Sequence, residues 1–147
     1  MEDAVVAYML TRATPDVAET IAWLGESGFT VRSHWGGRDA PFGNVKVELR
    51  REALAVQICV DRSQWTVDVA PTGHKYVNLV RLLTAMEGTE PDWEDSSGPL
   101  ARQLPEGVPW RSALPAMIAW IESGDRTKAI ESAVKAWRAA TKRHPNL

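Results

Sequence analysis

The clearest pattern along the chain is a strict alternation of apolar and polar residues in three successive segments. It runs through residues 45–50, 54–60 and 65–70. Period-two alternation joined by short polar connections predicts an antiparallel β-meander with one buried face. In this register Trp65 points to the buried face and Cys59 to the opposite face.

Helical periodicity flanks the meander on both sides. Thr14 and Pro15 suit an N-cap and a first helical position, and the apolar positions that follow end at Gly28. A second helix, with Gly88 as its stop, is expected where apolar residues recur at helical spacing: Tyr76, Leu79, Leu83 and Met86. A helix–meander–helix unit over residues 14–88 is therefore predicted, because a lone meander cannot bury its apolar face.

The segments before and within this unit are less sharply patterned. Residues 4–12 fit a short helix or a strand. After a short strand at 29–33, the glycine pair Gly36-Gly37 and the dipeptide Ala40-Pro41 predict a loop up to Gly43.

The chain changes character after residue 88. Five prolines between residues 91 and 115 predict a connector over residues 89–115, and helical spacing returns in residues 112–144. There we expect two helices, separated at Gly124, with Trp137 in the core; Trp110 and Trp120 fit core or surface. The fold class is thus α+β, a single domain over residues 1–147 with an antiparallel meander of at least three strands packed against helices and a helical C-terminal part.

Composition supports a globular protein and gives little sign of catalysis. The chain carries 17 Lys+Arg and 19 Asp+Glu, for a net charge of −2, and 44% of its residues are hydrophobic. The single cysteine cannot form an intramolecular disulfide, so nothing calls for an oxidising compartment. No apolar run approaches the roughly 20 residues that span a membrane, and the N-terminus lacks the basic region of a signal peptide. We expect a cytoplasmic protein without membrane contact.

The motifs of cofactor and metal chemistry are missing from the sequence. It contains no phosphate-binding Gly-Lys-Ser/Thr loop, no dinucleotide glycine fingerprint and no His-Glu-x-x-His. One cysteine and three histidines are too few for a Cys-rich zinc site. A Ser-His-Asp triad stays open in principle, but no serine sits on a recognisable nucleophile elbow. We expect no enzyme, cofactor or metal, and a pI of about 5.9 argues against a nucleic-acid partner.

Charge is distributed unevenly and marks a first candidate interface. Residues 1–86 carry 9 basic and 10 acidic side chains, residues 87–109 carry 1 and 6, and residues 110–147 carry 7 and 3. In the acidic connector, carboxylates surround one indole: Glu90, Asp92, Trp93, Glu94 and Asp95. Such a run fits a solvated loop. It also fits a patch that docks into a basic cleft, where acidity speeds encounter and the indole holds the complex.

The glycine-rich loop at residues 34–43 is a second candidate interface. It offers two aromatic and two charged side chains: Trp35, Arg38, Asp39 and Phe42. Its two adjacent glycines would let a partner approach the backbone closely. The alternative is a loop that folds Trp35 and Phe42 against its own sheet.

A family resemblance appears in the central half of the chain. The run Phe42-Gly43-Asn44-Val45, the paired strands, and then Asp61-Arg62-Ser63-Gln64-Trp65-Thr66-Val67 before a Leu-rich helix resemble small bacterial α+β proteins. These include immunity proteins encoded beside polymorphic toxins. The helix–meander–helix order is also similar to that of the YbjN and type III secretion chaperone-like group. The resemblance covers about residues 17–88.

The resemblance implies inhibition by binding, in which an immunity protein covers the active site of a toxin or locks its conformation. We therefore expect a non-enzymatic antitoxin that binds one cognate toxin domain and acts as a monomer or weak homodimer. Occlusion would come from Trp93 and its surrounding carboxylates, assisted by loop 34–43. The alternative is a secretion chaperone or adaptor, which would bind an extended segment of an effector protein instead of a folded domain.

Overall fold

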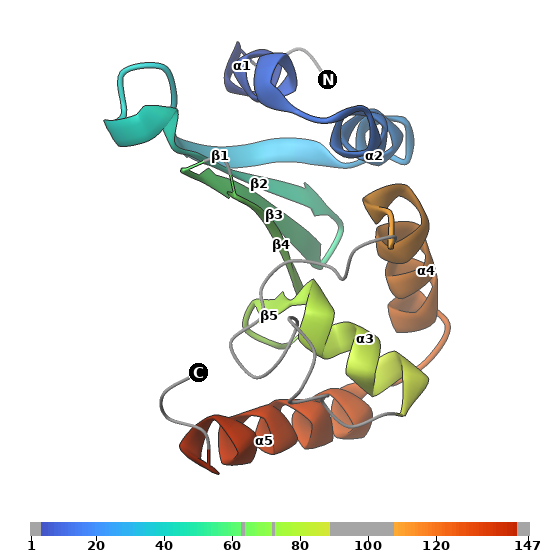
Figure 1. Cartoon of the computed structure of the whole chain (residues 1–147). Helices are drawn as coiled ribbons and strands as arrows, with labels where there is room; N and C mark the ends of the chain where they lie inside the picture. Colours follow the sequence, from blue (N-terminus) through green and yellow to red (C-terminus); the bar gives the residue numbers. More distant parts are fainter. Residues whose placement is uncertain (1–3, 63, 72, 89–107, 144–147) are drawn as a thin grey trace. The chain divides into compact units, whose positions relative to one another are not determined.

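A computed structural model describes residues 4–62, 64–71, 73–88 and 108–143 (Figure 1). Along the chain the elements are α1 (Ala4–Arg12), α2 (Pro15–Glu26), β1 (Thr30–Gly36), the 3₁₀ helix η1 (Pro41–Gly43), β2 (Val45–Arg51), β3 (Leu54–Asp61), β4 (Gln64–Ala70), β5 (Val77–Asn78), α3 (Leu79–Glu87), α4 (Trp110–Glu122) and α5 (Thr127–Arg143). The five strands form one sheet in the order β1-β2-β3-β4-β5. The predicted α+β class, with an antiparallel meander and a helical C-terminal part, is confirmed.

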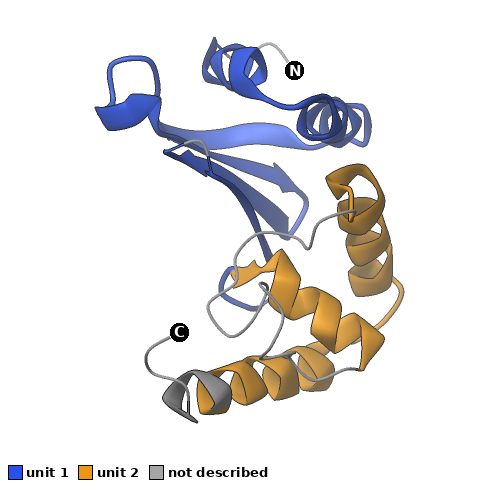
Figure 2. Cartoon of the chain, viewed as in Figure 1, with its two compact units in different colours: residues 1–76 blue, residues 77–147 orange. Residues whose placement is uncertain are grey.

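The chain divides into two compact units, residues 1–76 and residues 77–147 (Figure 2). The boundary falls inside the helix–meander–helix unit predicted over residues 14–88, between β4 and α3. The first unit holds the meander and both N-terminal helices.

The core of the first unit lies between its two helices and one face of the sheet (Figure 1). The inward apolar positions of the three meander strands are buried, except Trp65: Val45, Val47, Leu49, Leu54, Val56, Ile58, Val60, Val67 and Val69. The register places Val47 opposite Ile58 and Ile58 opposite Val67, so these residues share one face. Trp65 pairs with Val60 and lies on the same face, as predicted, with its side chain half-buried.

The capping signals in the sequence determine where α2 lies. Thr14 Oγ1 accepts a hydrogen bond from the amide of Val17 (3.4 Å), and Pro15 occupies the first turn, as predicted. Gly28 follows the helix with φ +94°, a left-handed conformation that glycine adopts without strain. The open choice for residues 4–12 is settled as the helix α1.

The second unit corrects the predicted position of one helix. The helix expected to include Tyr76 begins only at Leu79, because Asn78 caps it by accepting a hydrogen bond from the amide of Val80 (3.0 Å). Its buried positions are therefore Leu79, Val80 and Leu82, whereas the predicted Leu83 and Met86 are half-buried. Its stop at Gly88, with φ +68°, is confirmed.

Helix α3 packs against both α4 and α5. Trp137 of α5 is 1% exposed and donates from Nε1 to Thr84 Oγ1 of α3 (3.1 Å), which confirms its predicted place in the core. The structure also decides the two open tryptophans: Trp110 is buried at the start of α4, and Trp120 is half-buried. Helix α4 begins within the stretch predicted as connector and passes through Pro115, whose missing amide removes a single helical hydrogen bond.

Candidate functional site

Trp35, predicted to lie in a loop, belongs to β1. The strand extends to Gly36, and Trp35 pairs with Lys46 of β2. The short strand predicted at 29–33 is therefore found, and two features hid its continuation to Gly36 from the sequence. All five residues from Arg32 to Gly36 are exposed, and the register shifts between Val31 and Ser33, so no period-two pattern survives.

The segment between β1 and β2 is closed by its own backbone. Four hydrogen bonds hold it: Gly37 N to Asn44 O (2.9 Å), Ala40 N to Gly37 O (3.1 Å), Gly43 N to Ala40 O (2.9 Å) and Asn44 N to Pro41 O (3.1 Å). Gly36 has φ +85°, and a Cβ there would collide with the carbonyl oxygen of Asn44. Only glycine fits at that position, because the two chain segments approach each other so closely.

Helix α1 supports this segment from one side. Arg12 donates from Nη1 to the carbonyl oxygen of Gly43 (2.6 Å). A Cβ added at Gly43 would lie 2.5 Å from the hydroxyl of Tyr8, and the Arg38 guanidinium carbon lies 5.7 Å from the centroid of the Tyr8 ring. The segment is therefore tied to a helix that itself buries Val6 and Met9 in the core.

This supported segment exposes two large aromatic side chains. Trp35 is 58% exposed and Phe42 is 67% exposed, the two highest values among the large apolar side chains of the described residues. Trp35 lies two residues before Gly37, and Phe42 lies two residues before Asn44. The amide of Gly37 donates a hydrogen bond to the carbonyl oxygen of Asn44. Phe42 also has φ 58° and ψ 13°, a left-handed conformation that a bulky residue rarely adopts. Neither ring is folded away against the sheet.

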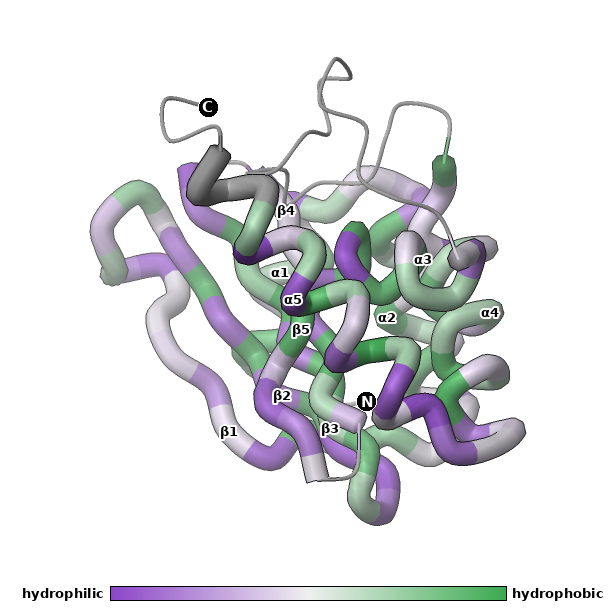
Figure 3. The backbone as a smooth tube through the Cα atoms, turned by 90° about the horizontal axis from the view of Figure 1, so that it is seen from below, coloured by the Kyte–Doolittle hydropathy of each residue, from purple (hydrophilic) through white to green (hydrophobic). Residues whose placement is uncertain are grey.

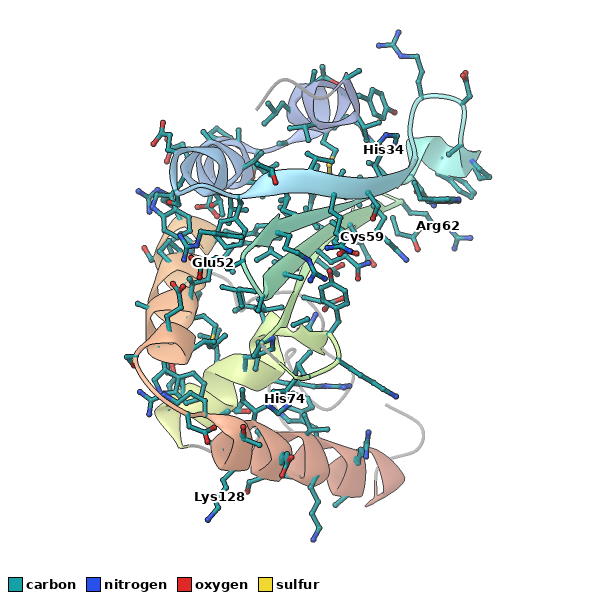
Figure 4. The ribbon with its side chains drawn as sticks, turned by 180° about the vertical axis from the view of Figure 1, so that it is seen from behind. His34, Glu52, Cys59, Arg62, His74 and Lys128 are labelled. Carbon is teal, nitrogen blue, oxygen red and sulfur yellow. The ribbon has the colours of Figure 1, made fainter. Side chains whose placement is uncertain are left out.

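The β3–β4 hairpin contributes Arg62, which was not among the predicted interface residues. Its guanidinium carbon lies 4.8 Å from the centroid of the Phe42 ring. Its amide donates to Asn44 Oδ1 (3.0 Å), and Asn44 Nδ2 donates to Asp61 Oδ1 (3.1 Å). Figure 4 shows Arg62 and His34 at the same end of the sheet. We call the group Trp35, Phe42 and Arg62 the aromatic surface.

The remaining predicted interface residues divide into two groups. Arg38 and Asp39 are both exposed, in the turn that precedes η1. The acidic group lies outside the described residues: Glu90, Asp92, Trp93, Glu94 and Asp95.

Two titratable groups of the sheet's outer face, Cys59 and Tyr76, have raised pKa values. Burial raises the pKa of the Cys59 thiol, which keeps it in the less nucleophilic protonated form. Burial, followed by the nearby Glu48 carboxylate, raises the pKa of Tyr76 to about 12. Glu48 is engaged by Arg50, whose Nη2 lies 3.5 Å from Glu48 Oε1. At neutral pH, Tyr76 is therefore a neutral phenol and Cys59 a neutral thiol.

The described part of the chain also contains no metal site. Within it, no three residues among His, Cys, Asp and Glu come together in a way that could hold a metal ion. His34 on β1 and His74 in the turn after β4 lie well apart (Figure 4). In the same ranges, no helix combines the length and the apolar character needed to cross a membrane.

Comparison with known proteins adds no relative to this picture. No protein-family model, curated protein or solved structure matches the chain. Any functional inference therefore depends on the geometry of the aromatic surface and on the sequence resemblance over about residues 17–88.

Proposed function

We propose that this chain is a non-enzymatic inhibitor of the immunity type, which binds a cognate bacterial toxin domain and occludes its active site. It would act in the cytoplasm of the producing cell, on one protein partner, as a monomer or weak homodimer. The resemblance to immunity proteins suggests this class of function. The aromatic surface supplies the physical support for it.

The supporting observation is the exposure of Trp35 and Phe42 on a segment whose backbone is already fixed. Large aromatic side chains dominate the energetics of protein interfaces. A segment held in place before binding loses little conformational entropy when a partner docks. Here four internal hydrogen bonds and the Arg12–Gly43 contact do this holding. Exposed apolar area in this arrangement is typical of a docking surface.

Arg62 adds polar recognition to the aromatic surface. Its planar guanidinium stacks on Phe42 and has donors that suit a carboxylate or a backbone carbonyl of a partner. Stacking also restricts the rotamers of both side chains before a partner arrives. The surface therefore combines two apolar anchors with a planar cation, the residue types enriched at interface hot spots.

The test is capture of a partner followed by a functional assay. Tagged wild-type chain is used to isolate partners from the source cells, beside the double variant Trp35→Ser/Phe42→Ser and the control Leu10→Ser. Leu10 is also an exposed apolar residue, 40% exposed, but α1 places it on the side away from Tyr8 and Arg12. We expect one folded protein in a 1:1 complex by native mass spectrometry, retained by the control and lost by the double variant.

The captured protein is then expressed in a bacterial host with or without the chain. Arrested growth that wild type and Leu10→Ser restore, and that the double variant does not, supports the proposal. A captured protein without toxicity contradicts it. Capture of many extended, unrelated clients would favour the secretion chaperone instead.

The acidic connector is tested separately, by charge reversal at Asp92, Glu94 and Asp95 to lysine. If the connector meets a basic cleft of the toxin, the triple variant will bind more weakly and its affinity will depend less on salt. Unchanged affinity and salt dependence would remove Trp93 and its neighbouring carboxylates from the mechanism and leave the aromatic surface as the interface.

A further inference from the structure

We infer that the outer edge of β1 accepts an extended, acidic segment of the protein partner as an additional strand of the sheet. This inference deepens the proposed function and rests on it, since it specifies how the partner meets the surface beside Trp35. It requires a strand edge with unpaired backbone groups, a charge that selects the segment, and an occupant other than a second copy of this chain.

The edge is open in the first unit. β1 is the terminal strand of the order β1-β2-β3-β4-β5, and its only strand neighbour is β2. Figure 3 shows β1 outermost among the strands of the first unit, with β2 beside it. Six of its seven residues are exposed, all except the half-buried Val31. Among the described residues no hydrogen bond links residues 30–36 to anything but β2.

The register shows which backbone groups face this edge. The β2–β3 hairpin has a two-residue connection closed by the pair Arg51–Leu54, and such a closing pair is hydrogen-bonded. Hydrogen-bonded pairs alternate, so the odd-numbered residues of β2 bond to β3 and the even-numbered ones bond to β1. Lys46 then pairs with Trp35 through hydrogen bonds. His34, one residue earlier, directs its N–H and C=O to the open edge.

The charge carried by β1 determines which kind of partner segment can pair with it. Within residues 30–36 the ionisable side chains are Arg32 and His34, both exposed, and the strand carries no acidic residue. Arg32 forms no salt bridge with another described residue, while Glu48 on the neighbouring strand is engaged by Arg50. Oppositely charged cross-strand neighbours stabilise a pair of strands, and like charges destabilise it. An incoming strand with Asp or Glu near Arg32 is therefore favoured.

The same charges disfavour a second copy as the occupant. Pairing β1 with β1 of another copy would put two arginines, one from each copy, on one short ladder. The shift in register beside Arg32 further limits the length of regular ladder that two copies could form. A partner segment of opposite charge avoids the like-charge repulsion, and only the one register shift of β1 interrupts its ladder.

The test uses a random dodecapeptide library displayed on phage, selected on the wild-type chain. Selected peptides are synthesised and their affinities are measured by titration calorimetry on three variants. His34→Pro removes the edge N–H and is tolerated on an edge strand, His34→Thr keeps the N–H without the imidazole, and Arg32→Glu reverses the charge. We expect peptides rich in Asp or Glu that alternate with β-branched residues.

Affinity should fall about tenfold or more in His34→Pro and Arg32→Glu and change less than about twofold in His34→Thr. On wild-type protein the His34 amide should exchange rapidly alone and slowly with saturating peptide, a readout that does not depend on how the variants fold. Equal affinity for His34→Pro, unchanged exchange at His34, or selected peptides without acidic residues would overturn the inference. So would a wild-type dimer that His34→Pro dissociates.

The inference and the proposed function can fail separately. A toxin that binds His34→Pro normally but is lost from Trp35→Ser/Phe42→Ser would overturn the edge and leave the inhibitor in place. Peptides that bind the edge as expected, in a chain that neutralises no toxin, would leave the edge and overturn the inhibitor.

Discussion

The two ends of β2 are supported by the same kinds of arginine contact, but the phenylalanine ring is exposed at one end and buried at the other. Before Val45, Gly43 has φ +65°, Arg12 donates to its carbonyl oxygen (2.6 Å), and Arg62 stacks on Phe42 at 4.8 Å. At the other end, Arg51 performs both tasks for the turn between α2 and β1.

The turn between α2 and β1 contains Gly28, with φ +94°. Arg51 donates to the carbonyl oxygen of Ser27 (2.8 Å) and stacks on Phe29 at 4.7 Å. Phe29 is 2% exposed, whereas Phe42 at the opposite end is 67% exposed. Arginine–ring contacts of similar length are therefore found at both ends of β2. Phe29 at one end belongs to the core, and Phe42 at the other end is exposed to solvent. At both ends the arginine contacts order the backbone. The burial of each ring determines how much that ring stabilises the fold.

Removing the two phenyl rings gives the largest expected contrast. Phe29→Ala should lower the free energy of unfolding by about 3–5 kcal/mol, because a buried ring leaves a cavity. Phe42→Ala should lower it by less than about 1 kcal/mol, because an exposed ring loses only its contact with Arg62. Urea unfolding followed by circular dichroism measures both values. Equal losses would show that Phe42 contributes to the core and would end the comparison.

Removing the two arginine–carbonyl contacts gives the next effect. Arg51→Ala should cost about 1–2 kcal/mol of global stability, because the half-buried carbonyl of Ser27 loses its donor next to the core. Arg12→Ala should act locally, with faster amide exchange at Gly37 and Gly43 and a smaller change in the unfolding midpoint. Arg51→Lys and Arg12→Lys, which keep the charge but lose the planar fork, are the matched controls. If Arg12→Ala leaves the exchange of Gly37 and Gly43 unchanged, α1 does not hold the segment.

The buried end and the meander could be predicted from the sequence, because burial of one face leaves a period. The alternation in residues 45–70 located β2, β3 and β4, and Thr14 located the start of α2. The exposed end leaves no such record. Every residue of β1 from Arg32 to Gly36 is exposed, so no hydrophobic pattern marks the strand beyond the segment predicted at 29–33. The two residues of β5 are too few for any period.

The candidate site was predictable in part for the same reason. Trp35 and Phe42 could be singled out because they stand outside every apolar stripe beside a glycine pair. Their exposure could not be decided, because it depends on contacts from Arg12 and Asn44 that the sequence does not order in space. Arg62 was missed because only the hairpin geometry brings it to Phe42, a residue 20 positions away.

Buried and exposed groups also differ on the outer face of the sheet, where Tyr76 lies near Glu48. The pKa of Tyr76 is raised to about 12 by burial and by that carboxylate, against an ordinary value of 10.0. Between about pH 10 and 12 the unfolded chain ionises this phenol while the folded chain keeps its proton, so the free energy of unfolding falls as pH rises through that range. Absorbance at 295 nm should show Tyr76 titrating above its ordinary value.

The control for this effect is Tyr76→Phe, which should flatten the alkaline decline of stability. If Tyr76 titrates at its ordinary pKa, burial does not raise its pKa, and the outer face is as exposed to solvent near Glu48 as it is near Trp35.

The smallest expected effect isolates the backbone strain at the exposed end. Phe42→Asn and Phe42→Ala both remove the ring, but asparagine accepts the left-handed conformation at φ 58° more readily than alanine. Phe42→Asn should therefore be more stable than Phe42→Ala by up to about 1 kcal/mol, while both lose partner affinity. At the buried end, where Phe29 has no positive φ, Phe29→Asn should instead be no more stable than Phe29→Ala, because it adds a buried polar group. If Phe42→Asn is no more stable than Phe42→Ala, the left-handed backbone at residue 42 is not strained. The exposed ring of Phe42 is then held there at no cost in backbone energy.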